Sequence, residues 1–365
     1  MLAILAGLPL RRSARAESKP QEIKSPLWRL DLRQFGYAAP YQRAVDGEPF
    51  SPHTSWLTFV GDRRLVVLFP SYEGNRKRFA AVPFRLHILL LDASNGQTIA
   101  TRLWQAKVAP VEVRATGAGD ILVQSGTHIG LFSSSLQEVG SLDLPATSDG
   151  MAQDWSMLLS PSGHSFFLES TSLGPRTLKL IDLATLSEIR FWDNTSGVGA
   201  VSDHLLAGLR KGELCIRSVD SPWREIHAIT ACLPGVRARF LTDDTVLVAG
   251  CKSFTVLRAD GEVLFEKVVP KDYCVYPEAV ASADGTRVAI KVGRLKGVNI
   301  PALDLGRSYV PQQLAVYDTK TQEEVGRMRL GYRTGLALSP DGSMLVHADE
   351  GILQLFRLLG AKPTH

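Results

Sequence analysis

Residues 336–346 read LALSPDGSMLV, two short apolar runs joined by the turn Ser339-Pro340-Asp341-Gly342. Proline presets φ at the second turn position, aspartate can hydrogen-bond the local backbone, and glycine adopts the left-handed conformation that a hairpin bulge requires. Apolar runs on both sides of such a turn are typical of two antiparallel β-strands. The stretch therefore predicts a tight β-hairpin.

Similar hairpins occur earlier in the chain. Residues 157–168 carry the turn Ser160-Pro161-Ser162-Gly163, and residues 279–290 carry Ser282-Ala283-Asp284-Gly285, each between apolar runs. Recurrence of one supersecondary unit is the sign of a repeat architecture, in which each unit buries its apolar surface against its neighbours. The repeats should therefore recur along the chain at a fixed period.

A second recurring element, an apolar strand that ends in aspartate before a short polar turn, gives this period. Its aspartates are Asp92, Asp182 and Asp318, which lie 90 (182 − 92) and 136 (318 − 182) residues apart. These intervals are close to two and three repeats of about 45 residues, the length of one propeller blade. Filling in the weaker copies gives seven units, near residues 56–107, 111–145, 154–194, 199–230, 236–270, 276–330 and 333–358.

The last unit has sequence for only three strands, which would leave one sheet with an open edge and a liability to aggregate. The segment Trp28-Arg29-Leu30-Asp31-Leu32-Arg33 alternates apolar and charged residues, as a half-exposed strand does. We expect residues 26–35 to supply the missing outer strand. The sequence thus predicts an all-β fold, a seven-bladed β-propeller of four-stranded antiparallel blades that an N-terminal strand closes onto the last blade.

Through Ser339-Pro340-Asp341-Gly342, its partial copies and the strand ends at Asp92, Asp182 and Asp318, the sequence resembles the bacterial WD-repeat-like and YVTN-type seven-bladed propellers. The Gly-His and Trp-Asp dipeptides of true WD repeats are absent from their usual positions. The resemblance covers most of the chain. It implies a propeller fold, and its motifs contain no catalytic residues.

Composition bounds the function. The chain has 365 residues, of which 45% are hydrophobic and 21% charged, so a sizeable core is expected. A formal charge of +4 is too small an excess of basic residues to indicate nucleic-acid binding. After the first few residues, no apolar run approaches the ~20 residues that a membrane-spanning helix requires. Residues 1–16 resemble a truncated export signal, with residues 17–25 as a linker, 26–358 as one propeller and 359–365 as a tail. We expect an exported protein, periplasmic or extracellular.

Cysteines and histidines indicate neither a metal nor a cofactor. None of the four cysteines has metal-ligand spacing, and the histidines are scattered without an HxxxH pair. Cys215 lies in an apolar run and reads as a small buried residue. Cys232 and Cys251 flank an expected hairpin and could form a disulfide in an oxidising compartment; four unpaired thiols are the alternative.

Two long insertions between second and third strands, Ser71–Phe84 and Val292–Pro311, belong to the units that flank the last one. Both are basic, and both should rise on the same face of the ring, where loops on a rigid scaffold often carry function. We expect this sector to bind a protein or an anionic ligand, or else to be solvated loop. The candidate binding residues are Arg76, Arg78, Phe79, Arg294, Lys296 and Tyr309.

An enzyme is the alternative, because lactonases and quinoprotein-like dehydrogenases also use propellers, with sites at the mouth of the central channel. Polar residues on the expected innermost strands could converge there for acid–base work or simply line a hydrated channel. These channel-mouth candidates are Glu112, Arg114, Arg237, Arg239 and Glu278. The sequence favours a non-catalytic binding or scaffold propeller over a lactonase-like or quinoprotein-dehydrogenase-like enzyme.

Overall fold

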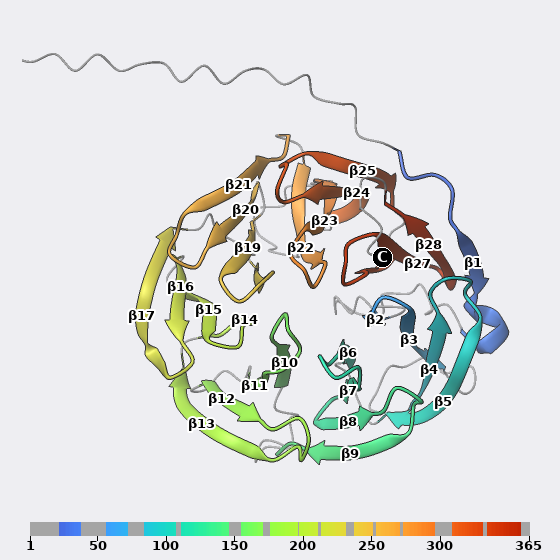
Figure 1. The fold of residues 1–365 in the computed structure, drawn as a ribbon, viewed down its shortest axis with the longest axis horizontal. Coiled ribbons are helices and arrows are strands. Elements are labelled where there is room, and N and C mark those ends of the chain that lie inside the picture. Colours follow the sequence, from blue (N-terminus) through green and yellow to red (C-terminus); the bar gives the residue numbers. More distant parts are fainter. Residues whose placement is uncertain are drawn as a thin grey trace, which may run out of the picture.

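The computed structural model describes residues 22–37, 56–71, 84–106, 111–145, 155–170, 176–195, 197–210, 213–230, 237–250, 253–270, 273–295, 309–330 and 334–358. In this part of the chain one single-turn 3-10 helix, η1 (Leu32–Phe35), accompanies 28 β-strands. The strands form seven four-stranded antiparallel sheets arranged as blades around a ring (Figure 1). The prediction of an all-β, seven-bladed propeller is confirmed.

Within each blade the strands follow one another from the channel to the rim. Blade 1 contains β2 (Trp56–Val60), β3 (Arg64–Ser71), β4 (Phe84–Asp92) and β5 (Thr98–Ala106). Blade 2 contains β6 (Val111–Ala115), β7 (Ile121–Ser125), β8 (His128–Phe132) and β9 (Glu138–Asp143). Blade 3 contains β10 (Trp155–Leu159), β11 (Phe166–Ser170), β12 (Arg176–Ile181) and β13 (Glu188–Thr195).

The remaining blades repeat this order, except that the outermost strand of blade 7 comes from the start of the chain. Blade 4 contains β14 (Ala200–Val201), β15 (Leu205–Arg210), β16 (Glu213–Ser218) and β17 (Ser221–Thr230). Blade 5 contains β18 (Arg237–Phe240), β19 (Thr245–Ala249), β20 (Ser253–Arg258) and β21 (Val263–Val268). Blade 6 contains β22 (Tyr273–Ala281), β23 (Arg287–Leu295), β24 (Tyr309–Asp318) and β25 (Glu324–Arg329). Blade 7 contains β26 (Thr334–Leu338), β27 (Met344–Asp349), β28 (Ile352–Arg357) and β1 (Trp28–Asp31).

Because successive strands are antiparallel, the connections of every blade fall on two opposite faces of the ring. On one, which we call the turn face, lie the inner hairpin turns between first and second strands and the outer hairpin turns between third and fourth strands. On the other, the crossover face, the second strand passes to the third and each blade passes to the next. The two long insertions predicted from the sequence depart from the crossover face.

The N-terminal strand closes the ring as predicted. β1 pairs antiparallel with β28, in a register that runs from Trp28 opposite Leu355 to Asp31 opposite Ile352. The outer edge of blade 7 is therefore covered by the beginning of the chain rather than by its end (Figure 1).

The closing segment extends beyond blade 7. Before β1, the amide of Ile23 donates to the carbonyl of Arg327 on β25 of blade 6 over 2.8 Å. Within β1, the indole Nε1 of Trp28 donates to the carbonyl of Ala93 in blade 1 over 2.8 Å. After β1, Leu32 and Tyr37 pack into the core shared with blade 1. We call residues 22–37 the N-terminal clamp, because they bind blades 6, 7 and 1 together.

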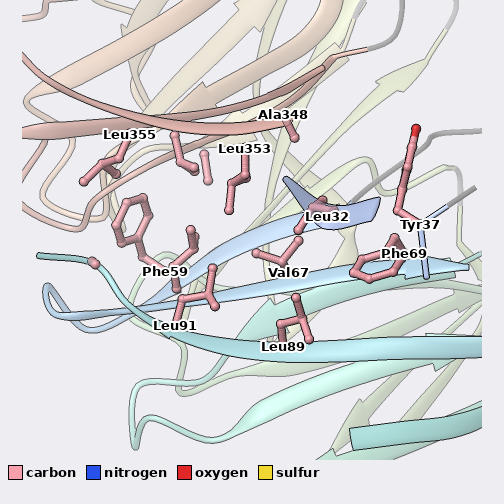
Figure 2. Packing of buried hydrophobic residues seen from close by; sticks show 14 residues of the cluster. Leu32, Tyr37, Phe59, Val67, Phe69, Leu89, Leu91, Ala348, Leu353 and Leu355 are labelled. Carbon is pink, nitrogen blue, oxygen red and sulfur yellow. The ribbon is translucent and has the colours of Figure 1, made fainter. Parts of the chain in front are cut away.

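The apolar core is divided among the seams between adjacent blades, as a stack of thin sheets requires. At the seam between blades 7 and 1, Leu32 and Tyr37 of the clamp meet Val67 and Phe69 of blade 1 and Leu353 of blade 7 (Figure 2). Each fully buried side chain of this kind contributes about 1.5–3 kcal/mol. The clamp therefore secures the seam by packing as well as by strand pairing.

The hairpin turns have the chemistry that their sequence predicts. In the inner turn of blade 7, the Ser339 hydroxyl donates to the Asp341 carboxylate over 2.6 Å, and Gly342 has a left-handed φ of 67°. In blade 3, Gly163 has a φ of 72°, and its carbonyl accepts from the Gly117 amide of blade 2 over 3.0 Å. A Cβ on Gly163 would collide with that amide, so glycine is required there.

Candidate binding faces and the central channel

The crossover face carries the predicted binding residues only in part within the described chain. Arg76, Arg78, Phe79 and Lys296 lie outside the described residues. Arg294 lies at the end of β23 and Tyr309 at the start of β24, where these strands pair through Leu295 opposite Tyr309. The side chains of Arg294 and Tyr309 are not described.

The strand ends that bound both insertions belong to one sector of the ring. Segment 72–83 connects β3 to β4 in blade 1, and segment 296–308 connects β23 to β24 in blade 6, so both leave the crossover face. Blades 6 and 1 are the two neighbours of blade 7, and the N-terminal clamp binds all three. The scaffold beneath the sector over blades 6, 7 and 1 is therefore fixed by direct contacts.

On the turn face, hydrogen bonds link the inner hairpin turns of neighbouring blades. Ser162 of blade 3 donates to the Asp203 carboxylate of blade 4 over 2.7 Å, and the Asp203 amide donates to Asp243 of blade 5 over 3.2 Å. The Asp284 amide of blade 6 donates to the carbonyl of Pro340 in blade 7 over 3.1 Å. These turns form a collar that ties the blades together near the channel.

This collar is acidic. Burial raises the pKa of Asp62 in blade 1, and the nearby carboxylates of Asp341 and Asp284 raise it further. Asp341 itself has a lowered pKa: burial opposes the shift, but hydrogen bonds from Ser339 and Ser343 outweigh it. Sequence reasoning assigned Asp284 and Asp341 to turn chemistry alone and did not single out Asp62. Their recurrence at the inner hairpins was the signal that they gather on one face.

The channel-mouth candidates are brought together in part. Glu112 and Arg114 lie on β6 and form an ion pair, with Arg114 Nη2 3.2 Å from Glu112 Oε2. Arg239 lies on β18, where water reaches its side chain and its Nη1 donates to the carbonyl of Ala279 over 3.5 Å. Arg237 on β18 and Glu278 on β22 lie on innermost strands, and their side chains are not described.

Arg114 contributes to the electrostatic environment of Arg239. Although water reaches the Arg239 side chain, the surrounding protein partly desolvates it, and this desolvation, followed by the positive charge of Arg114, lowers the pKa of Arg239 to about 10. Their strands belong to blades 2 and 5, which are not adjacent in the ring. Both side chains are exposed on innermost strands, so both guanidinium groups are accessible from the channel.

Two seams contain buried polar side chains that the sequence analysis did not single out. Between blades 3 and 4, Glu169 accepts from the Val198 amide over 2.5 Å, and Arg176 lies 3.5 Å from the same carboxylate. Burial raises the pKa of Glu169 despite these partners. Between blades 6 and 7, Lys291 and His347 are buried at 5% and 4% exposure. In the sequence, a buried polar residue of this kind could have been recognised as a polar residue in an otherwise apolar run, as in the stretch Phe166-Phe167-Leu168-Glu169.

For the remaining predictions the structure gives a mixed record. Cys215 is buried, as predicted. Cys232 and Cys251, the predicted disulfide partners, lie outside the described residues. Among the described residues, no group of three or more His, Cys, Asp or Glu side chains is gathered in the way a metal ion requires. None of the helices in this part of the chain has the length and apolar character needed to cross a membrane.

Comparison with known proteins supports the fold. No family model and no curated protein matches the sequence. The chain is similar to the β-propeller domain of Cps50 (Swd1) from Myceliophthora thermophila, with a TM-score of 0.56 and 12% identity over 84% of this chain and 97% of that one. It is also similar to Hsv2 from Kluyveromyces marxianus, with a TM-score of 0.53 and 13% identity over 81% and 88% of the two chains.

A third similarity is to BamB from Moraxella catarrhalis, with 12% identity over 93% of this chain and 99% of that one; its TM-score of 0.42 is too low to support an argument. At such identities the first two similarities show the propeller fold alone. Function must therefore be argued from the faces and the channel of this chain.

Proposed function

We propose that this protein is a non-catalytic binding scaffold that holds an acidic protein segment against the crossover face over blades 6, 7 and 1. The observation that carries the proposal is the N-terminal clamp, which fixes blade 7 to blades 6 and 1, the two blades whose strand ends bear the long insertions. A rigid platform with long connections on one face is the usual arrangement for recognition.

Charge supports an acidic partner. Segment 72–83 contains Arg76, Lys77 and Arg78 against one carboxylate, Glu73. Residues 294–308 contain Arg294, Lys296 and Arg307 against Asp304. Phe79 and Tyr309 would add the aromatic contact area that binding surfaces favour. Positive charge of this kind raises association rates and disfavours basic partners more than it adds affinity.

The test uses a fluorescent glutamate-rich peptide and the full chain, with binding followed by fluorescence anisotropy. Replacing Arg76, Arg78, Arg294 and Lys296 together with alanine should weaken binding about tenfold or more, since exposed charges contribute ~0.2–1 kcal/mol each. Raising the salt concentration should weaken the wild-type complex and affect the variant less. Unchanged binding by the variant would overturn the proposal.

A matched control removes the same charge from the opposite side of the blades. Arg63, Arg190, Arg258 and Arg357 are exposed and lie in or near hairpin turns of the turn face. Their quadruple alanine variant should bind the peptide as tightly as the wild type does. Equal weakening in both variants would mean that the peptide responds to net charge alone, and the proposed sector would be wrong.

The enzyme alternative is separated by a stability measurement. A propeller that works as a lactonase or a quinoprotein dehydrogenase should gain thermal stability from calcium or from a quinone cofactor, because a ligand that binds only the folded state raises the melting temperature. The binding scaffold should show the same melting temperature with and without either addition. A saturable rise of several degrees would favour the enzyme.

Two finer statements about origin stay predictions. We infer from the turn motifs that the chain belongs with the bacterial WD-repeat-like and YVTN-type propellers, and from residues 1–16 that it is exported. Expressing the chain in a bacterium and assaying the periplasmic and cytoplasmic fractions tests export. Recovery of the whole chain in the cytoplasm would contradict it.

A further inference from the structure

The innermost strands present two arginines where the other blades present uncharged side chains. On each innermost strand, we take the last residue whose side chain packs against the preceding blade of the ring. The residue just before it in the sequence marks one common level of the channel. In blade order, the seven residues at this position are Thr58, Arg114, Leu158, Ala200, Arg239, Val280 and Ala337. Among these seven residues only Arg114 and Arg239 can be charged, although Glu112 on the same strand forms an ion pair with Arg114.

The two arginines have few partners in the described part of the chain. Arg114 donates to the carbonyl of Val113 over 3.1 Å and forms the ion pair with Glu112. Arg239 has only the long contact of 3.5 Å to the carbonyl of Ala279. Water reaches both side chains although both strands are innermost, so these groups face a hydrated space in the channel.

Two like charges in a confined space repel one another. Burial is the larger cause of the lowered pKa of Arg239, and the positive charge of Arg114 adds to it. An anion placed between them would replace the repulsion by two attractions. The planar guanidinium fork makes paired hydrogen bonds to phosphate oxygens, so arginine suits such a group better than lysine does.

We propose that Arg114 and Arg239 form an anion site inside the channel for a phosphate group, either free or carried on a small ester. The site is independent of the binding face proposed above, because its residues belong to blades 2 and 5. The acidic collar lies beyond Arg114 and Arg239 on the turn face, where it opposes the entry of anions.

Isothermal titration calorimetry with inorganic phosphate at constant ionic strength tests the site, with glycerol 3-phosphate as a second titrant to distinguish free from esterified phosphate. At least one titrant should bind the wild type in a saturable manner. Arg114→Gln and Arg239→Gln should each weaken that binding at least about tenfold, because hydrogen bonds to charged groups contribute ~1.5–3 kcal/mol.

Arg258→Gln is the matched control, since Arg258 is exposed at the end of β20, away from the channel, and it should leave phosphate binding unchanged. Melting curves without phosphate show whether the variants fold; removing like-charge repulsion should leave the melting temperature of Arg239→Gln equal to or above that of the wild type. If neither titrant binds the wild type, or if folded Arg114→Gln and Arg239→Gln bind as tightly as the wild type, the proposal is wrong.

Discussion

The two seams that flank blade 7 are built from different contacts. The seam with blade 1 is mainly apolar: the clamp fills it with Leu32 and Tyr37 (Figure 2), and the partly exposed His87 stacks on Phe69 there. The seam with blade 6 is apolar near the turn face, where Leu336 and Leu345 pack against Ala289, but it buries Lys291 and His347 as well. The seam at which the chain closes is thus held by packing, whereas the other accepts ionisable groups inside the core.

This difference assigns two roles. The apolar seam stabilises the ring, because burial of apolar surface is the largest favourable contribution to folding. Buried ionisable groups add little to stability and make it depend on pH. Both seams lie beneath the proposed binding sector. We therefore expect the contact of blade 7 with blade 1 to be the more stable one, and the contact with blade 6 to weaken when the pH changes.

The largest expected effect breaks the apolar seam. Leu32 has no exposed surface, so Leu32→Ala should lower the free energy of unfolding by about 2–5 kcal/mol, through lost burial and the cavity left behind. Leu27 lies in the same clamp and is 48% exposed, so Leu27→Ala should change it by no more than about 0.5 kcal/mol. Urea denaturation measures both variants. Equal effects would show that the clamp does not secure the seam.

The second largest expected effect is the pH dependence of stability that His347 gives to the seam between blades 6 and 7. Burial lowers the pKa of His347 from 6.5 to about 4, and the positive charge of Lys291 acts in the same direction. Gln354 lies opposite His347 in the strand register and favours its protonation, yet neither ring nitrogen makes a hydrogen bond of good geometry within the described chain. The folded protein thus keeps this imidazole neutral at pH values where the unfolded chain protonates it.

Stability due to His347 is therefore lost as the pH falls from about 6.5 to about 4, by about 3 kcal/mol at most. Asp349, whose pKa is raised by burial and by Glu350, contributes with the opposite sign at the acid end of this range. The histidine is isolated by comparing wild type with His347→Leu in denaturation curves at several pH values. The variant should lose less stability on acidification; parallel profiles would contradict the assignment.

The smallest expected effect concerns one hydrogen bond of the clamp. Trp28→Phe removes the indole donor to the Ala93 carbonyl and keeps most of the aromatic surface. The free energy of unfolding should fall by about 0.5–1.5 kcal/mol, the usual net value of one hydrogen bond. Thermal denaturation measures the change. No change in the melting temperature would mean that this hydrogen bond is no stronger than the one that the indole makes with water in the unfolded chain, so that it does not stabilise the clamp.

The fold could be predicted from the sequence because the same turn residues recur in several blades. Ser339-Pro340-Asp341-Gly342 and its copies mark the inner hairpins, and alternation from Trp28 to Arg33 marks the closing strand. The full reach of the clamp was not predictable. Ile23 and Tyr37 contact blades 6 and 1 through single side chains or single amides, which leave no periodic pattern in the sequence.

The site was less accessible to sequence reasoning for a physical reason. Arg114 and Arg239 were identified as channel candidates because the strand order places them on innermost strands. Their mutual influence depends on how far two long side chains extend from non-adjacent blades, and the sequence holds no distance between blades. The basic insertions stay a prediction from composition, and the peptide-binding comparison above tests them.

Hydrogen exchange of the clamp amides in the full chain tests most directly whether the start of the chain closes the ring. Ile23, Leu27 and Leu32 donate to the carbonyls of Arg327, Leu355 and Gly351 over 2.7–2.8 Å. If the clamp is part of the cooperative fold, these amides should exchange as slowly as those in β27, through global unfolding alone. Exchange at the rate of exposed amides, with β27 still protected, would contradict the account.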